Sequence, residues 1–156
     1  MLKLEIPGRS DILLEGIVFD MNGTLTVDGE LAAGDRKHLM LLAGKLQVYV
    51  LTADTFGTAA TMFAGLPLEI CRLKGGTGFL EKKKFIDSRD SSSLAAVGNG
   101  YNDHLMLQSA ALGICVLGEE GAHPLTMTHA DLIVPSTRAA LELFLHPLRL
   151  IAGLRR

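Results

Sequence analysis

The chain has 156 residues, a formal net charge of −2 and 48% apolar residues. This length suits one domain with one core, and the apolar share is large enough to fill it. A charge so close to neutral lacks the basic stripe of a nucleic-acid-binding protein, so no nucleic-acid partner is expected. Charged residues interrupt every apolar run before it reaches the roughly 20 residues of a membrane-spanning helix, and the N-terminus lacks the pattern of a signal peptide. We therefore expect a cytoplasmic protein without membrane contact.

The first half of the chain predicts a hairpin followed by alternating strands and helices. Residues 2–6 and 11–15 flank Pro7-Gly8-Arg9-Ser10, a turn signal typical of a hairpin. Apolar runs predict strands and helical spacing predicts helices, in the order strand 17–20, helix 34–46, strand 47–52, a helix capped by Thr55, and strand 68–73. Asp54 is expected to be a solvated loop residue.

The second half continues the same alternation up to the last predicted helix. The pattern predicts helix 78–87, strand 94–97, helix 102–110, strand 112–117, a short helix 124–129, strand 132–134, and a helix capped by Ser136. Strands that alternate with helices indicate an α/β protein with a parallel, doubly wound sheet and right-handed crossovers. We expect one domain over residues 1–156, with residues 1–15 as an N-terminal hairpin extension.

Two predicted strands end in polar loops that contain glycine and aspartate. The apolar run before Asp20 leads into Asn22-Gly23-Thr24, and strand 94–97 leads into Gly98-Asn99-Gly100-Tyr101-Asn102-Asp103. Parallel strands bring their carboxyl ends to one edge of a sheet, where open α/β folds place their active sites. We therefore expect the two loops to meet around a phosphate group and a magnesium ion.

The order Asp20-x-x-Gly-Thr-Leu-Thr followed by Gly98-x-Gly-x-Asn-Asp resembles the haloacid dehalogenase (HAD) superfamily of phosphatases and phosphotransferases. Within it, the chain resembles the phosphorylation domain of P-type ATPases and small soluble proteins similar to that domain. The resemblance implies a HAD-like, Rossmann-like fold of three α/β/α layers. Many members insert a cap domain after the first catalytic loop, but only about ten residues, 24–33, are available there. We therefore expect a capless member, whose open site suits a large substrate or closure by a neighbouring subunit.

The resemblance assigns Asp20 as the nucleophile, which forms an aspartyl-phosphate. Most phosphatases of the superfamily carry an aspartate at the position of Asn22, where it acts as general acid and base. P-type ATPases also lack an acid there. An amide has no proton to exchange at neutral pH, so we expect substrates with good leaving groups, such as an acyl phosphate or a nucleotide, and a long-lived phosphoenzyme. The alternative interpretation of Asn22 is a plain turn residue.

The phosphate-binding residues implied by the resemblance come from three further segments. Thr52 and the backbone N–H of Ala53 follow the second core strand, and Asn102 contacts the phosphoryl group from the last loop. A lysine neutralises phosphate and nucleophile together. The pumps carry a lysine, two residues and then two aliphatic residues; Lys82, followed by Phe85 and Ile86, is matched to this pattern, and Lys74 is the alternative.

The resemblance also implies a Mg²⁺ site made of oxygen ligands. The ligands are Asp20, the backbone carbonyl of Asn22, Asn99 and, in a supporting place, Asp103. The family usually has an aspartate at the position of Asn99. The amide supplies no negative charge, so we expect weaker magnesium binding than in relatives with one more carboxylate.

These residues together predict a Mg²⁺-dependent phosphohydrolase or phosphotransferase. Its partner is expected to be a small phosphorylated substrate or a phosphoprotein, and its C-terminal tail is expected either to pack locally or to mediate homo-oligomer formation. The alternative prediction is a non-enzymatic regulatory module that binds phosphate or nucleotide, because two carboxylates are missing from one site. A covalent phosphoenzyme distinguishes the two, since a binding module cannot form one.

Overall fold

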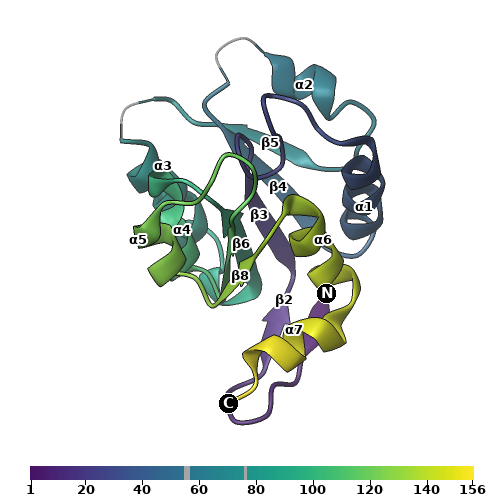
Figure 1. Ribbon diagram of the computed structural model, residues 1–156, viewed down its shortest axis with the longest axis vertical. Coiled ribbons are helices and arrows are strands. Elements are labelled where there is room, and N and C mark those ends of the chain that lie inside the picture. Colours follow the sequence, from purple (N-terminus) through teal and green to yellow (C-terminus); the bar gives the residue numbers. More distant parts are fainter. Residues whose placement is uncertain (55–56, 76) are drawn as a thin grey trace.

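The computed structural model describes residues 1–54, 57–75 and 77–156. Its centre is a parallel sheet of six strands in the order β5-β4-β3-β6-β7-β8 (Figure 1). These strands are β3 (Gly16–Asp20), β4 (Gln47–Thr52), β5 (Glu69–Arg72), β6 (Leu94–Gly98), β7 (Leu112–Val116) and β8 (Leu132–Val134). The strand order reverses between β3 and β6, which places a topological switch point at the middle of the sheet.

Helices cover both faces of the sheet and create two apolar layers. The layer on one face contains α1 (Ala33–Ala43), α2 (Thr58–Met62), α6 (Thr137–Leu145) and α7 (Pro147–Leu154). The opposite face is covered by α3 (Gly78–Asp87) and α4 (His104–Ser109), with α5 (Pro124–Thr128) packed beside α4 (Figure 1). The architecture is therefore the predicted three-layer α/β/α fold. Among the described residues, no domain is inserted between β3 and α1 or between β5 and α3.

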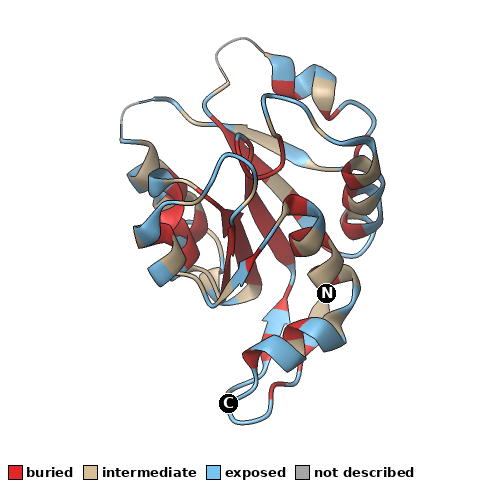
Figure 2. Ribbon diagram, viewed as in Figure 1, coloured by how far each residue is buried: buried red, intermediate tan, exposed pale blue. Residues whose placement is uncertain are grey.

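The middle strands are buried along their whole length. Every residue of β3, β6 and β7 is buried, so the strands appear as an unbroken core in Figure 2. Near-continuous apolar sequence is what a parallel strand covered on both faces requires. Asp20 is the one acidic or basic residue within these three strands, and it stands at the carboxyl end of β3.

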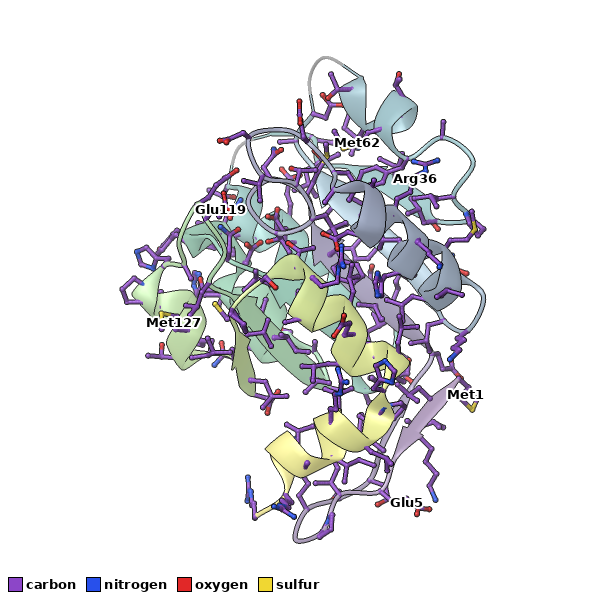
Figure 3. All side chains as sticks on the ribbon, turned by 45° about the vertical axis from the view of Figure 1, so that its right-hand side comes forward. Met1, Glu5, Arg36, Met62, Glu119 and Met127 are labelled. Atoms are coloured by element: carbon purple, nitrogen blue, oxygen red, sulfur yellow. The ribbon has the colours of Figure 1, made fainter. Side chains whose placement is uncertain are left out.

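The predicted N-terminal hairpin is confirmed as a separate two-stranded sheet. β1 (Leu2–Leu4) pairs antiparallel with β2 (Ile12–Leu14), with Leu2 opposite Leu14. The tail forms α7, which the sequence did not predict as a helix. It packs against β1 and buries Leu150 and Leu154, and Figure 3 shows it beside the hairpin that carries Glu5. The tail therefore packs locally, which is one of the two expected outcomes.

The helix after β4 begins later than predicted. Thr55, its predicted cap, lies outside the described residues, and α2 begins at Thr58. Asp54 is not merely solvated, since its carboxylate accepts hydrogen bonds from Thr58 Oγ1 at 3.2 Å and from the backbone N–H of Ala59 at 2.9 Å. The expectation for Asp54 was wrong because a carboxylate satisfies unpaired N–H groups at a helix start, even from several residues away.

Two other helix boundaries also depend on capping. Helix 34–46 ends at Ala43, and Lys45 N then donates to Leu42 O at 2.8 Å, an i→i−3 bond that tightens the last turn. Segment 102–110 begins as a 3₁₀ turn, η2 (Tyr101–Asp103), before α4. The predicted cap of α6 is confirmed, as Ser136 Oγ accepts from Ala139 N at 3.1 Å. Among the described residues, no helix is both long and apolar enough to span a membrane.

Candidate active site

A buried lysine joins the two predicted catalytic loops. Lys82 Nζ lies 2.5 Å from Asp20 Oδ1 and 2.6 Å from Asp103 Oδ1, and Lys82 is only 1% exposed. The three residues come from β3, α3 and η2, whose ends meet beside the switch point. Lys82 and Ile86 stand one turn apart on the buried face of α3, which directs the lysine into the protein. The cluster therefore holds two carboxylates and one ammonium group away from water.

The charges of this cluster shift one another's proton affinity. The pKa of Asp20 is raised to about 7, because burial disfavours its ionised form and the Asp103 carboxylate repels it, while Lys82 opposes both effects. Burial by itself lowers the pKa of Lys82, but the two carboxylates outweigh this and the pKa is raised. The lysine is therefore charged at neutral pH. A divalent cation beside Asp20 would favour the ionised carboxylate in the same way as Lys82 does.

Asp103 is fixed by three hydrogen bonds. Besides Lys82, it accepts from the backbone N–H groups of Asn99 and Gly100, both at 2.9 Å through Oδ2. Gly98 makes room for it, since a Cβ atom there would lie 2.5 Å from Asp103 Cγ. Asp103 therefore holds Lys82 and the last loop in place, and its role toward a metal stays a prediction.

Oxygen atoms of the two loops converge on one hydroxyl group. Thr24 Oγ1 lies 3.2 Å from Asp20 Oδ2 and 3.1 Å from Asn99 Oδ1, and all three residues are buried. A hydroxyl carries one hydrogen, so it can donate to only one of these oxygens at a time. The other keeps its lone pairs, and the adjacent carbonyl of Asn22 is a further acceptor. This set of neutral and anionic oxygens fits Mg²⁺, which prefers oxygen ligands.

The amide of Asn99 does something that the usual aspartate could not. Its Nδ2 donates to Gly121 O at 3.0 Å, and its backbone carbonyl accepts from His123 N at 2.8 Å. These contacts attach the loop after β7 to the catalytic loop. An aspartate would direct a carboxylate oxygen at the Gly121 carbonyl, without a proton to share. The departure from the family pattern therefore has a structural reason that the sequence did not show.

A cavity of about 530 Å³ lies over this cluster. The residues lining it are Asp20, Asn22, Thr52, Ala53, Leu73, Gly75, Gly78, Lys82, Asn99, Gly100 and Asn102. All the predicted site residues line it except Asp103, which is fully buried behind Lys82. The alternative lysine, Lys74, is exposed and outside this lining, so the structure brings Lys82 and not Lys74 to Asp20.

The phosphate-binding candidates lie around the same cavity. Thr52 is buried at the end of β4, and its Oγ1 accepts from Asp54 N at 3.1 Å. As the acceptor in this contact, the hydroxyl keeps its own hydrogen for donation to a phosphate oxygen. Ala53 and Asn102 are exposed at the cavity, so they are accessible to a ligand.

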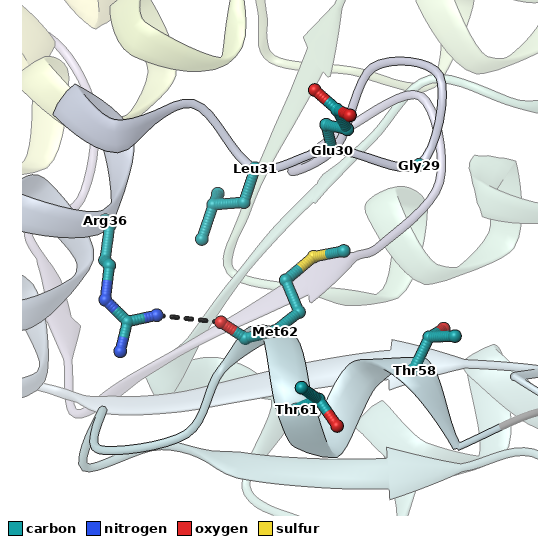
Figure 4. A pocket seen from close by; sticks show the side chains of 7 residues that line it. All are labelled: Gly29, Glu30, Leu31, Arg36, Thr58, Thr61 and Met62. Atoms are coloured by element: carbon teal, nitrogen blue, oxygen red, sulfur yellow. Dashed lines mark hydrogen bonds between the residues drawn. The ribbon is translucent and has the colours of Figure 1, made fainter.

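A second cavity, of about 510 Å³, lies between the loop after β3 and α2 (Figure 4). Residues from Gly29 to Leu31 line one side, and Met62 lies on the other. Arg36 donates to Met62 O at 2.7 Å and also to Ala64 O, so the guanidinium is used in holding α2. No predicted site residue lines this cavity, and the catalytic candidates belong to the first cavity alone.

Sequence reasoning missed the loop of residues 118–121, Gly-Glu-Glu-Gly, which touches both catalytic loops. Glu120 Oε1 accepts from Asp28 N at 2.9 Å, and Gly121 O accepts from Asn99. Its position could have indicated a role in the site, because this loop follows β7 at the same edge of the sheet as the loops after β3 and β6. Its two glycines at positive φ allow the sharp turn.

No model of a known protein family matches the chain. The uncharacterized protein MJ0073 of Methanocaldococcus jannaschii is 37% identical to it over 92 residues, which make up 56% of this chain and 99% of that protein. Nearly the whole of that relative therefore corresponds to part of this chain.

Solved structures share the fold at low sequence identity. The 3-deoxy-D-manno-octulosonate 8-phosphate phosphatase of Moraxella catarrhalis, in complex with a magnesium ion, a phosphate ion and a KDO molecule, has a TM-score of 0.71 at 17% identity, covering 91% of this chain and 94% of that one. A protein of Streptomyces avermitilis described as a HAD-family hydrolase has a TM-score of 0.64 at 18% identity, covering 91% and 84%. This chain belongs to the same family as MJ0073 of M. jannaschii, and its fold is that of the HAD superfamily.

Proposed function

We propose that the protein is a Mg²⁺-dependent phosphohydrolase that acts through an aspartyl-phosphate on Asp20. The observation that carries this proposal is the buried contact of Lys82 with Asp20, at 2.5 Å, at the base of the main cavity. A buried cation beside a carboxylate can balance the charge that a bound phosphate adds. We also propose that the protein is related to the phosphorylation domain of P-type ATPases. We further propose that it can transfer phosphate to an acceptor other than water.

The reaction has two displacement steps. An oxygen of Asp20 attacks phosphorus and forms an oxygen–phosphorus bond, while the bond to the leaving group breaks and its electron pair departs with that group. Water then attacks the same phosphorus, and the bond between phosphorus and the Asp20 oxygen breaks. Its electron pair returns to Asp20 and restores the carboxylate, while the hydrogens of the water leave with inorganic phosphate. Lys82, the Thr52 hydroxyl and the N–H of Ala53 bind the phosphoryl oxygens in both steps, and Asn102 contacts them from the cavity mouth.

Asp20, the Asn22 carbonyl and Asn99 would hold a magnesium ion, with Asp103 supporting the loop. When bound, the ion neutralises negative charge on the phosphoryl group and on the nucleophile. The M. catarrhalis phosphatase, solved with magnesium and phosphate, supports a divalent cation and a phosphate in this fold. Asn22 contributes its carbonyl but offers no acid to the leaving group, which favours acyl phosphates and nucleotides over alkyl phosphates.

The test is to trap the covalent intermediate. The protein is mixed with Mg²⁺ and labelled acetyl phosphate or ATP, quenched in acid, and the label is mapped by peptide mass analysis. Label on the Asp20 peptide supports the proposal. Binding of phosphate without a trapped species or turnover, on these substrates and on p-nitrophenyl phosphate, would favour the regulatory binding module. Label on another peptide would assign the nucleophile elsewhere.

The leaving-group preference gives a separate prediction at Asn22. Asn22→Asp should raise the hydrolysis rate of a sugar phosphate by about 10²-fold and shorten the lifetime of the phosphoenzyme, because it introduces a general acid and base. Acetyl phosphate turnover should change much less at the first step. Steady-state rates on both substrates and single-turnover decay of trapped label measure the two effects. Fast sugar phosphate turnover by the unmodified protein would contradict the role given to Asn22.

The open cavity bears on the substrate. Since no cap domain covers the site within the described part of the chain, both a small phosphorylated molecule and a phosphorylated residue of another protein can approach Asp20. We propose these two classes as partners. Homo-oligomer formation over this edge of the sheet would narrow the choice to small molecules.

A further inference from the structure

The loop of residues 118–121 covers the start of the first catalytic loop. A Cβ atom at Gly118 would lie 3.5 Å from the carbonyl oxygen of Gly23, and one at Gly23 would lie 2.8 Å from Glu120 Oε2. The same Cβ at Gly23 would lie 2.5 Å from Asn99 Nδ2. The carboxylate of Glu120 and the amide of Asn99 therefore lie against one face of Gly23, directly after the Asn22 carbonyl that the metal site uses.

Within the described ranges, one hydrogen bond holds the carboxylate of Glu120. Glu120 Oε1 accepts from the backbone N–H of Asp28 at 2.9 Å, which holds the side chain over the loop after β3. Oε2 is the oxygen that faces Gly23. The loop itself is held by the bond from Asn99 Nδ2 to Gly121 O and by His123 N, which donates to Asn99 O. Asn99, which is uncharged, thus positions the loop that carries the carboxylate of Glu120.

Charge balance gives this arrangement a consequence. The buried cluster holds the two carboxyl groups of Asp20 and Asp103 against the ammonium group of Lys82, and Asn99 adds no charge. A cation site with so little negative charge binds weakly, because each carboxylate near the ion contributes attraction. Glu120 is the carboxylate that touches this side of the site in the described structure.

We propose that Glu120 acts on the metal site through its charge. Its carboxylate supplies the negative charge that Asn99 lacks and so raises the affinity of the site for a divalent cation. The inference rests on the proposed function, because it takes Asp20, Asn22 and Asn99 as the metal-binding residues. Glu120 is exposed, so its contribution is electrostatic and decreases as ionic strength rises.

The variant Glu120→Gln separates charge from structure. A glutamine still offers Oε1 to Asp28 N, so the loop contact is kept and only the charge is lost. Glu119→Gln is the matched control, because Glu119 is the preceding residue on the same loop (Figure 3) and is also exposed, whereas the carboxylate that faces Gly23 belongs to Glu120. Thermal unfolding of both variants checks that each is folded.

Calorimetric titration with MgCl₂ alone, at low ionic strength and without substrate, measures the effect. Glu120→Gln should weaken binding by about fivefold and Glu119→Gln by less than about twofold, and the difference should shrink in 0.5 M salt, on the order of screening expected for an exposed charge. Equal effects of the two variants, or none, would overturn the inference. If the wild-type protein still forms phosphoenzyme with Mg²⁺ in that case, the proposed function stands. A wild-type protein that binds no Mg²⁺ overturns both.

Discussion

Replacing Asp20 by asparagine should lower kcat/KM for acetyl phosphate by at least about 10⁴-fold and remove the trapped phosphoenzyme, because a neutral amide replaces the carboxylate whose oxygen attacks phosphorus. Asn keeps the shape of the side chain and a carbonyl oxygen in reach of Thr24 Oγ1. The loss is therefore assigned to chemistry and not to a collapsed loop. Phosphate release and acid-quenched label, measured on the same samples, check it.

The same substitution should stabilise the protein when divalent ions are removed. The pKa of Asp20 is raised in the folded state to about 7 from an ordinary 3.8, so the fold prefers the protonated form. This contribution to stability is fully present below pH 3.8 and is lost as pH rises through 7. Asparagine imitates the neutral form at every pH. At pH 8 in EDTA we expect Asp20→Asn to increase the free energy of unfolding by about 2 kcal/mol, with the gain disappearing toward pH 4.

Asp28→Asn is the control for this pair of measurements. Asp28 is an exposed acid on the same loop, and its positive φ of 51° is one that asparagine tolerates. It should change neither the rate nor the pH dependence of stability by a comparable amount. Residual phosphoenzyme in Asp20→Asn would show that another residue is the nucleophile. A destabilised Asp20→Asn variant in EDTA would contradict the account of the buried charges.

The fold could be predicted from sequence where a local pattern decides the structure. Strand 47–52, strand 132–134 and helix 78–87 were predicted with the observed bounds, because continuous apolar runs and helical spacing mark them without help from distant residues. Helix α7 was not predicted, although Pro147 stands in its first turn, a position that proline suits. Asp54 was misjudged because the cap it provides depends on a helix that starts later than expected.

The residues of the candidate site could likewise be predicted where a local sequence pattern marks them, whereas contacts between distant loops could not. Asp20, Asn99 and Lys82 could be selected because each stands in a recognisable segment, and parallel strands bring such segments to one edge. The hydrogen bond from Asn99 to Gly121 and the approach of Glu120 to Gly23 join residues far apart in the chain. No spacing within one segment encodes such contacts. In the sequence, Asn99 therefore shows only that a carboxylate is missing. In the structure, its amide connects the loops after β3, β6 and β7.

Replacement of Lys82 by methionine should have the second large effect, on rate and on stability together. Without the ammonium group, Asp20 and Asp103 are left buried with no cation between them. We expect turnover to fall by about 10³-fold and the free energy of unfolding at pH 8 in EDTA to fall by about 3 kcal/mol. Phosphate release and urea unfolding monitored by circular dichroism measure the two losses.

Lys83→Met is the matched control, because Lys83 is the next residue of α3 and pairs at the surface with Asp87. A solvated pair contributes little, so its loss should change the unfolding free energy by less than about 1 kcal/mol and leave turnover unchanged. Lys74→Met tests the rejected alternative in the same assays. A larger loss of turnover in Lys74→Met than in Lys82→Met would assign the phosphate-neutralising role to Lys74. In that event the buried lysine would only hold the two aspartates together. A larger loss of turnover in Lys82→Met than in Lys74→Met would assign the neutralisation of the phosphate charge to Lys82. Lys82 already contacts Asp20, so it can offset the charges of the carboxylate and the phosphate without moving.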